Sequence, residues 1–159
     1  MPKIIQFHDI DNEEHYPKIK NDFMVVNLNQ RQYITNTSNT KINFNTVLDS
    51  NGDGLTLYNG GIRIGKGISK IRVDLSLWIE AYNGYSSWML YKNDDTMLTN
   101  NIFPGYTTEV WRTGNAFAYV SVKEGDIIYT YVRFSVANSN NNIAGNYSKS
   151  CLMGVHVIE

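Results

Sequence analysis

The sequence predicts an all-β protein, either a sandwich or a jelly roll. No window of helical length carries apolar residues at positions i, i+3, i+4 and i+7. Several windows instead alternate between apolar and polar residues, or contain runs of β-branched and aromatic side chains. Clusters of Gly, Asn and Asp interrupt these windows roughly every ten residues, which is the turn spacing of sandwiches and jelly rolls. At 159 residues, the chain is long enough for one domain with a hydrophobic core.

Three long strands are expected. In residues 69–81, Ile71 to Ile79 place every second side chain on an apolar face, and Trp78 lies among the polar residues of the other face. Residues 126–136 alternate in the same way after a Gly-containing turn, and residues 150–158 form the last strand. Shorter strands are expected at residues 55–58, 61–64, 87–92, 108–112 and 116–122. The Asn-rich residues 138–146 are predicted to be a loop and not an element.

Three regions are expected along the chain. Residues 1–21 contain two short apolar segments around an acidic turn, which predicts a small N-terminal hairpin that attaches the protein to something else. Residues 22–40 are a linker or a first strand. Residues 41–159 form the main β domain.

Charge and cysteine content exclude several classes of function. The chain has 14 basic and 15 acidic residues, a net charge of −1, so no positive field favours nucleic acid or an anionic membrane. No apolar run is long enough to span a bilayer, and the N-terminus lacks the apolar segment of a signal peptide, which favours synthesis in a cytoplasm. The single cysteine, Cys151, excludes an intrachain disulfide and is expected in the core.

Catalytic chemistry is not expected, and neither is a cofactor. Of the three histidines, His8 and His15 lie in the N-terminal segment, and only His156 lies in the main domain. No hydrolase motif is present, and the carboxylates concentrate in turns, where they usually cap backbone groups in solvent.

One turn resembles half of a calcium loop. Asp49, Asn51 and Asp53 supply oxygen atoms at alternate positions, with a Gly between them to allow the bend. The twelfth position is Gly60, where such a loop needs a bidentate carboxylate. The alternative is a plain Gly-Asp-Gly turn between two strands, and no metal is expected.

Three parts of the chain resemble parts of known proteins. The Gly-rich turn and strand of residues 60–73 are similar to the head domains of bacteriophage tail-fibre and receptor-binding proteins. Residues 120–129 and 150–158 look like the last strands of the tumour necrosis factor (TNF) and complement globular-head superfamily. Residues 4–7 with Tyr16-Pro17 resemble the opening hairpin of minor structural proteins of phages that infect Gram-positive bacteria.

This resemblance implies a TNF-like jelly roll of ten strands, assembled as a homotrimer in a phage tail tip or fibre. It implies a virion protein made in the bacterial host cytoplasm, attached to tail or baseplate proteins through its N-terminus. The implied function is non-enzymatic host adhesion. A trimeric cap or baseplate component without receptor binding is the alternative, and a cell-wall polymer hydrolase is a third class.

A trimer interface is predicted on the second face of the inner strands. Trp78, Tyr129 and Tyr131 lie opposite apolar faces, and we expect them to form one contiguous patch. Alternation in the last strand adds Leu152 and His156 to this interface. The alternative is that these aromatic side chains are half exposed on a monomer.

A saccharide site is predicted in loops rich in aromatic and amide side chains. Aromatic rings stack on sugar C–H faces, while amides, hydroxyls and Arg bind the sugar hydroxyl groups, although the same composition suits protein-binding loops. The candidate ligands for a host cell-surface saccharide or glycopolymer are Tyr82, Tyr85, Trp88, Tyr106, Trp111 and Arg112. For Trp88 and Trp111, a place in the core is the open alternative.

Overall fold

The computed structural model describes residues 21–81, 84–103, 110–144 and 151–159. In these residues, ten strands have four or more residues: β1 (Phe23–Asn27), β4 (Thr46–Asn51), β5 (Leu55–Tyr58), β6 (Gly61–Ile64), β7 (Lys70–Ala81), β8 (Ser86–Lys92), β9 (Thr96–Phe103), β10 (Val110–Ser121), β11 (Ile127–Phe134) and β13 (Leu152–Val157). Three more have two residues each: β2 (Gln32–Tyr33), β3 (Thr40–Lys41) and β12 (Asn142–Ile143). The described ranges contain no helix, and hence none that could cross a membrane.

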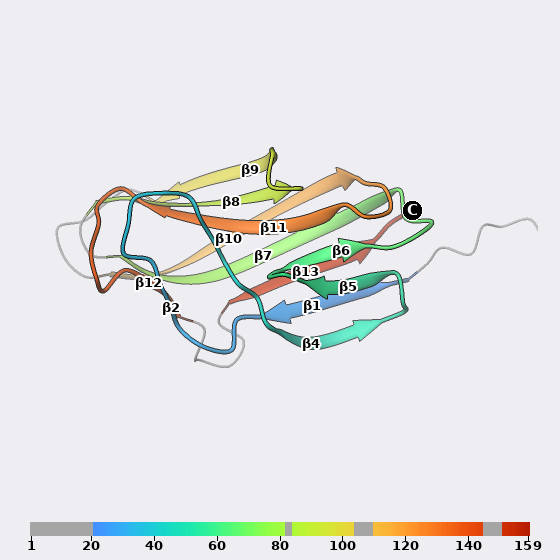
Figure 1. Ribbon diagram of the computed structural model, residues 1–159, viewed down its shortest axis with the longest axis horizontal. Helices are drawn as coiled ribbons and strands as arrows, with labels where there is room; N and C mark the ends of the chain where they lie inside the picture. The colour runs from blue at the N-terminus through green and yellow to red at the C-terminus, as the bar shows by residue number, and fades with distance from the viewer. Residues whose placement is uncertain (1–20, 82–83, 104–109, 145–150) are drawn as a thin grey trace, which may run out of the picture.

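The strands form two antiparallel sheets that pack face to face (Figure 1). Sheet A has the order β2-β12-β7-β13-β1-β4, and β10 pairs along the other edge of β7. Sheet B has the order β5-β6-β11-β8-β9, with β3 also paired to β11. The all-β sandwich predicted from the sequence is confirmed.

The core lies between the two sheets. On β7 the side chains from Ile71 to Ile79 alternate as expected, and the five apolar ones are at most 3% exposed. They face buried side chains of sheet B, among them Leu90, Val132 and Phe134. Each such side chain contributes about 1.5–3 kcal/mol by leaving water, so this alternation stabilises the sandwich. Cys151 is buried in the same core, as expected.

The sequence predicted two strands, at residues 108–112 and 116–122, in the region of β10, and this prediction was wrong. The structure has one strand, paired with β7 over its whole length from Val110 to Ser121. Gly114, which suggested a break, packs directly against the ring of Trp88. A Cβ at this position would lie 2.8 Å from the nearest ring atom. The glycine therefore makes room for a core aromatic side chain and does not end the strand.

Other strands lie in segments for which the sequence predicted a turn, a loop or no element at all. β4 includes Asp49 and Asn51, which were expected in a turn, and the exposed edge strand β9 was not expected at all. β12 lies within the predicted loop 138–146, and its Ile143 is fully buried. Residues 22–40, expected as a linker or first strand, contain β1 between β13 and β4. The predicted N-terminal hairpin lies almost entirely outside the described residues.

Candidate functional site

The predicted saccharide residues have different environments. Tyr82, Tyr106 and the side chain of Trp111 lie outside what the structure describes. Tyr85 is 41% exposed at the start of β8, and Arg112 on β10 holds its guanidinium 5.5 Å from the ring centroid of Phe103. Because Phe103 pairs with Ser86, next to Tyr85, the fold brings Tyr85 and Arg112 to the same end of the sandwich.

Trp88 belongs to the core. Its side chain is 3% exposed, and its ring centroid lies 4.3 Å from that of Phe103. The backbone of Gly114 also packs against the Trp88 ring. Stacking on a sugar needs a free ring face, so the expectation that Trp88 contacts a ligand was wrong, and the core alternative is correct for this residue.

The predicted interface aromatics do not form one patch. Trp78 lies on β7 in sheet A, whereas Tyr129 and Tyr131 lie on β11 in sheet B. These residues point away from the core on opposite sides of the sandwich, so they cannot meet. Because β7 and β11 belong to different sheets, the expected contiguous patch does not exist. Leu152 and His156, on β13 beside β7, do share the outer face of sheet A with Trp78.

On sheet B, the two tyrosines already have partners within the chain. The Nζ of Lys41 lies 3.5 Å from the ring centroid of Tyr129, which is 4% exposed. The Tyr131 hydroxyl donates a 2.6 Å hydrogen bond to Asp94, which also pairs with Lys41 at 3.0 Å. Burial, followed by the bond to Asp94 and its negative charge, raises the pKa of Tyr131 above its ordinary value.

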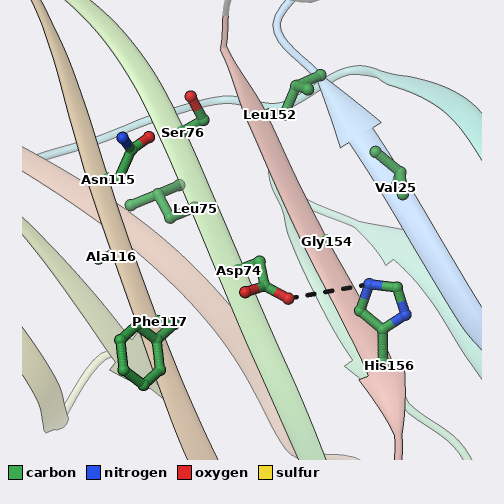
Figure 2. Close-up of a pocket in the computed structure, with 10 residues that line it drawn as sticks. All are labelled: Val25, Asp74, Leu75, Ser76, Asn115, Ala116, Phe117, Leu152, Gly154 and His156. Atoms are coloured by element: carbon green, nitrogen blue, oxygen red, sulfur yellow. Dashed lines mark ion pairs between the residues drawn. The ribbon is translucent and has the colours of Figure 1, made fainter.

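The outer face of sheet A contains a broad hollow (Figure 2). Strand register places Phe117 of β10, Asp74 of β7, Gly154 of β13 and Val25 of β1 in one row across the sheet. Gly154 has no side chain, so the surface of the sheet is depressed where this row crosses β13. The hollow has a volume of about 590 Å³. A second hollow on the same face, next to Tyr119 and His156, extends it.

Charged groups lie at the centre of this face. Arg72 donates a 2.8 Å hydrogen bond to Asp74, and the bond and charge of this carboxylate raise the pKa of Arg72. His156 Nε2 lies 3.9 Å from the second oxygen of Asp74, the contact drawn in Figure 2. One carboxylate therefore faces two basic side chains.

The edge beside this hollow carries the most exposed apolar side chains. Among the described residues, five large hydrophobic side chains are more than half exposed, and four of them lie on β9 or β10. Phe117 and Tyr119 of β10 are 66% and 62% exposed, and Met97 and Ile102 lie on β9. None of these four residues was predicted from the sequence as a surface residue of interest. The signal for β10 was the alternation of small and aromatic residues from Ala116 to Tyr119.

The half calcium loop consists of the end of β4, with Asp49 and Asn51, and the turn from β4 to β5, with Asp53. Gly52 adopts a φ of 79°, and the Gly54 backbone N–H donates a 2.9 Å hydrogen bond to the carboxylate of Asp22. Asn51, one of the three candidate ligands, uses its side-chain amide to bind the Asn21 carbonyl. In the described ranges, no three His, Cys, Asp or Glu side chains gather as a metal site would require. The turn orders its own backbone through Asp22.

Comparison with known proteins identifies the fold. No family model and no curated protein sequence matches the chain. Crystal structures of murine APRIL at pH 5.0 and pH 8.5 superpose with TM-scores of 0.70 and 0.69, at 10% sequence identity, over 87% of this chain and all of the APRIL chain. The structure of Eiger TNF from S. frugiperda superposes with a TM-score of 0.60, at 12% identity, over 87% of this chain and 91% of that chain. The predicted TNF-like jelly roll is confirmed.

Proposed function

We propose that this protein is a non-enzymatic, homotrimeric binding head that displays its loops to a receptor on a cell surface. The observation that carries the proposal is the outer face of sheet A, where a hollow over Gly154 lies beside the exposed side chains of Phe117 and Tyr119. The hollow and the exposed rings occur on the same chain, so the rings of one copy can fill the hollow of a second copy.

A closed ring of copies fits this arrangement. A projecting edge and a hollow are different surfaces, so their contact is head-to-tail, and such contacts close into rings when the rotation between copies allows it. Burial of Phe117 and Tyr119 removes two large rings from water, each worth about 1.5–3 kcal/mol when fully buried. The similarity to TNF-like structures supports a ring of three.

The proposed setting is the tip of a bacteriophage tail fibre. It rests on the resemblance of residues 60–73 and of the N-terminal segment to phage receptor-binding proteins. In this setting, residues 1–21 attach the trimer to tail or baseplate proteins, and the protein is a component of the virion made in the host cytoplasm.

A host saccharide or glycopolymer is the proposed receptor. One end of the sandwich holds both an exposed ring, that of Tyr85, and a guanidinium, that of Arg112. A ring stacks on a sugar, and Arg binds hydroxyl or phosphate oxygens. Three weak sites on one trimer, and several trimers on one particle, would multiply a low affinity for each site.

Two measurements test the proposal. Sedimentation velocity at micromolar concentration should give three times the 18.2 kDa chain mass, and a monomer at all concentrations would overturn the trimer. The trimer should bind host cell-wall polymer, and the double variant Tyr85→Ala, Arg112→Ala should lose at least tenfold in affinity while it stays trimeric. A trimer that binds no polymer would favour a structural cap, and hydrolysis of the polymer would overturn the non-enzymatic assignment.

A further inference from the structure

The three charged groups on the outer face of sheet A lie where the proposed trimer contact must form. Asp74 and His156 line both hollows of this face, and Arg72 lines the second. In the single chain these side chains are partly exposed, 38% for Asp74 and 49% each for Arg72 and His156. A neighbouring copy that covers the hollow therefore takes all three out of water.

Three strands supply the groups that surround His156. β7 contributes Asp74 at 3.9 Å and, in the same row as His156, Arg72. β1 contributes the Phe23 ring, which is uncharged and stacks on the imidazole at 5.9 Å between centroids. β10 contributes the phenol of Tyr119.

Three further charged groups lie farther from His156: Asp49, Lys70 and Glu159. Asp49 of β4 pairs with Val25, so its exposed carboxylate lies in the same row as Asp74, on the edge strand of the sheet. Lys70 is paired with Glu159 at 3.8 Å. Asp74 is therefore the carboxylate that faces His156 directly.

The protonation of one side chain sets the net charge of this cluster. With a neutral imidazole, the positive Arg72 and the negative Asp74 cancel, and a neutral cluster can be covered at moderate cost. With a protonated imidazole, one carboxylate faces two cations, and each copy brings one uncompensated positive charge into the contact. Three copies around one axis also repel each other.

We propose that protonation of His156 dissociates the assembly, so that the trimer is stable near neutral pH and comes apart on acidification. The inference rests on the proposed function, because it needs the outer face of sheet A to be the contact. Histidine is the side chain that ordinarily changes its charge between pH 5 and 8. The sign follows from linkage: the covered state disfavours the protonated imidazole, so association is accompanied by proton release and weakens as the pH falls.

The expected effect is large, because each chain contributes one histidine. One pH unit below the midpoint of the imidazole titration, about one chain in eleven is neutral. An assembly that requires three neutral chains then weakens by up to about a thousandfold. The carboxylates ordinarily titrate below pH 5, so between pH 5 and 8.5 the histidines are the side chains expected to change charge, and variants are needed to separate His156 from His8 and His15.

The test is sedimentation velocity of the full chain between pH 5 and 8.5, for the wild type and for His156→Gln. The wild type should change from trimer to monomer as the pH falls, and H156Q should keep one mass throughout. His15→Gln, in the N-terminal segment, is the matched control and should behave as the wild type. Circular dichroism at each pH separates dissociation from unfolding.

The outcomes separate the two proposals. A trimer whose association constant is the same at pH 5 and 8, or whose pH dependence survives in H156Q, overturns the histidine mechanism and leaves the trimer in place. A monomer at every pH overturns both.

Discussion

The aromatic side chains on the two outer faces of the sandwich differ in how far the chain itself covers them. On sheet B the rings are covered by cations of the same chain: Lys41 lies over Tyr129, and Arg63 lies 3.5 Å over Tyr58. On sheet A, Phe117 and Tyr119 form an edge-to-face pair with each other and remain more than 60% exposed. A hollow lies next to them, whereas the Tyr129 position on sheet B is filled.

This difference indicates which face is the better candidate for contact with another molecule. The number of aromatic residues on a face does not identify an interface, because sheet B has several and satisfies them itself. What matters is how much of each ring remains in contact with water after the chain has folded. By this criterion the proposed interface is on sheet A at β10, and not on β11.

The largest effect on stability is expected for a ring that lies between the two faces. Trp88→Ala should lower the free energy of unfolding by about 3–5 kcal/mol, because it leaves a cavity against Phe103 and Gly114. Denaturant unfolding measures this loss. Tyr85→Ala, nearby and exposed, is the control and should change stability by less than about 0.5 kcal/mol. Equal effects of the two variants would contradict the core position of Trp88.

A smaller loss is expected when sheet B loses its cation. Lys41→Met removes the ammonium over Tyr129 and its pair with Asp94, and should destabilise the chain by about 1 kcal/mol. Thermal unfolding of Lys41→Met and of Lys123→Met, an exposed lysine elsewhere, gives the comparison. If both variants unfold at the wild-type temperature, the covered state of sheet B has another cause.

The environment of Tyr131 on sheet B should make the stability of the chain depend on pH in the alkaline range. The pKa of Tyr131 is raised in the folded chain, so the unfolded chain loses this proton first as the pH rises through about 10. The contribution of Tyr131 is therefore complete below pH 10 and decreases above it. Tyr131→Phe should flatten the fall of stability between pH 10 and 11, measured by urea unfolding. An unchanged pH profile would contradict the bond to Asp94.

The smallest effect on the single chain is expected on sheet A. Phe117 is 66% exposed, so Phe117→Ala should change the stability of the dissociated chain by less than about 0.5 kcal/mol. The same variant should weaken self-association by at least tenfold, measured by sedimentation equilibrium. A variant that unfolds easily, or that associates as the wild type does, would remove Phe117 from the interface.

Much of the fold could be predicted from the sequence, because alternation is a local signal. β5 and β6 have the predicted bounds, and β7 and β11 differ by a few residues at their ends, since one buried face fixes their pattern. β9 and β4 lie at sheet edges and are largely exposed, so they have little apolar pattern to detect. Gly114 suggested a break in β10, because the residue that explains it, Trp88, lies on another strand and cannot be recognised from the local sequence.

The candidate site was harder to predict, because it depends on which strands are neighbours. Leu152 and His156 were placed on the outer face correctly, since alternation within one strand decides it. Tyr129 was predicted as an interface residue but is only 4% exposed, and the Lys41 that covers it is 88 positions away in the chain and in no motif with it. Pairing between distant strands and the partners of individual rings are three-dimensional facts that a local pattern does not contain.

Oxidative footprinting of the rings tests the central claim most directly. Hydroxyl radicals modify exposed side chains, and mass spectrometry compares a concentrated, assembled sample with a dilute, dissociated one. Phe117 and Tyr119 should become several-fold less reactive on assembly, while Tyr58, 42% exposed on sheet B, should react equally in both samples. Protection of Tyr58 with unchanged reactivity of Phe117 and Tyr119 would contradict the assignment of sheet A as the surface that joins the copies.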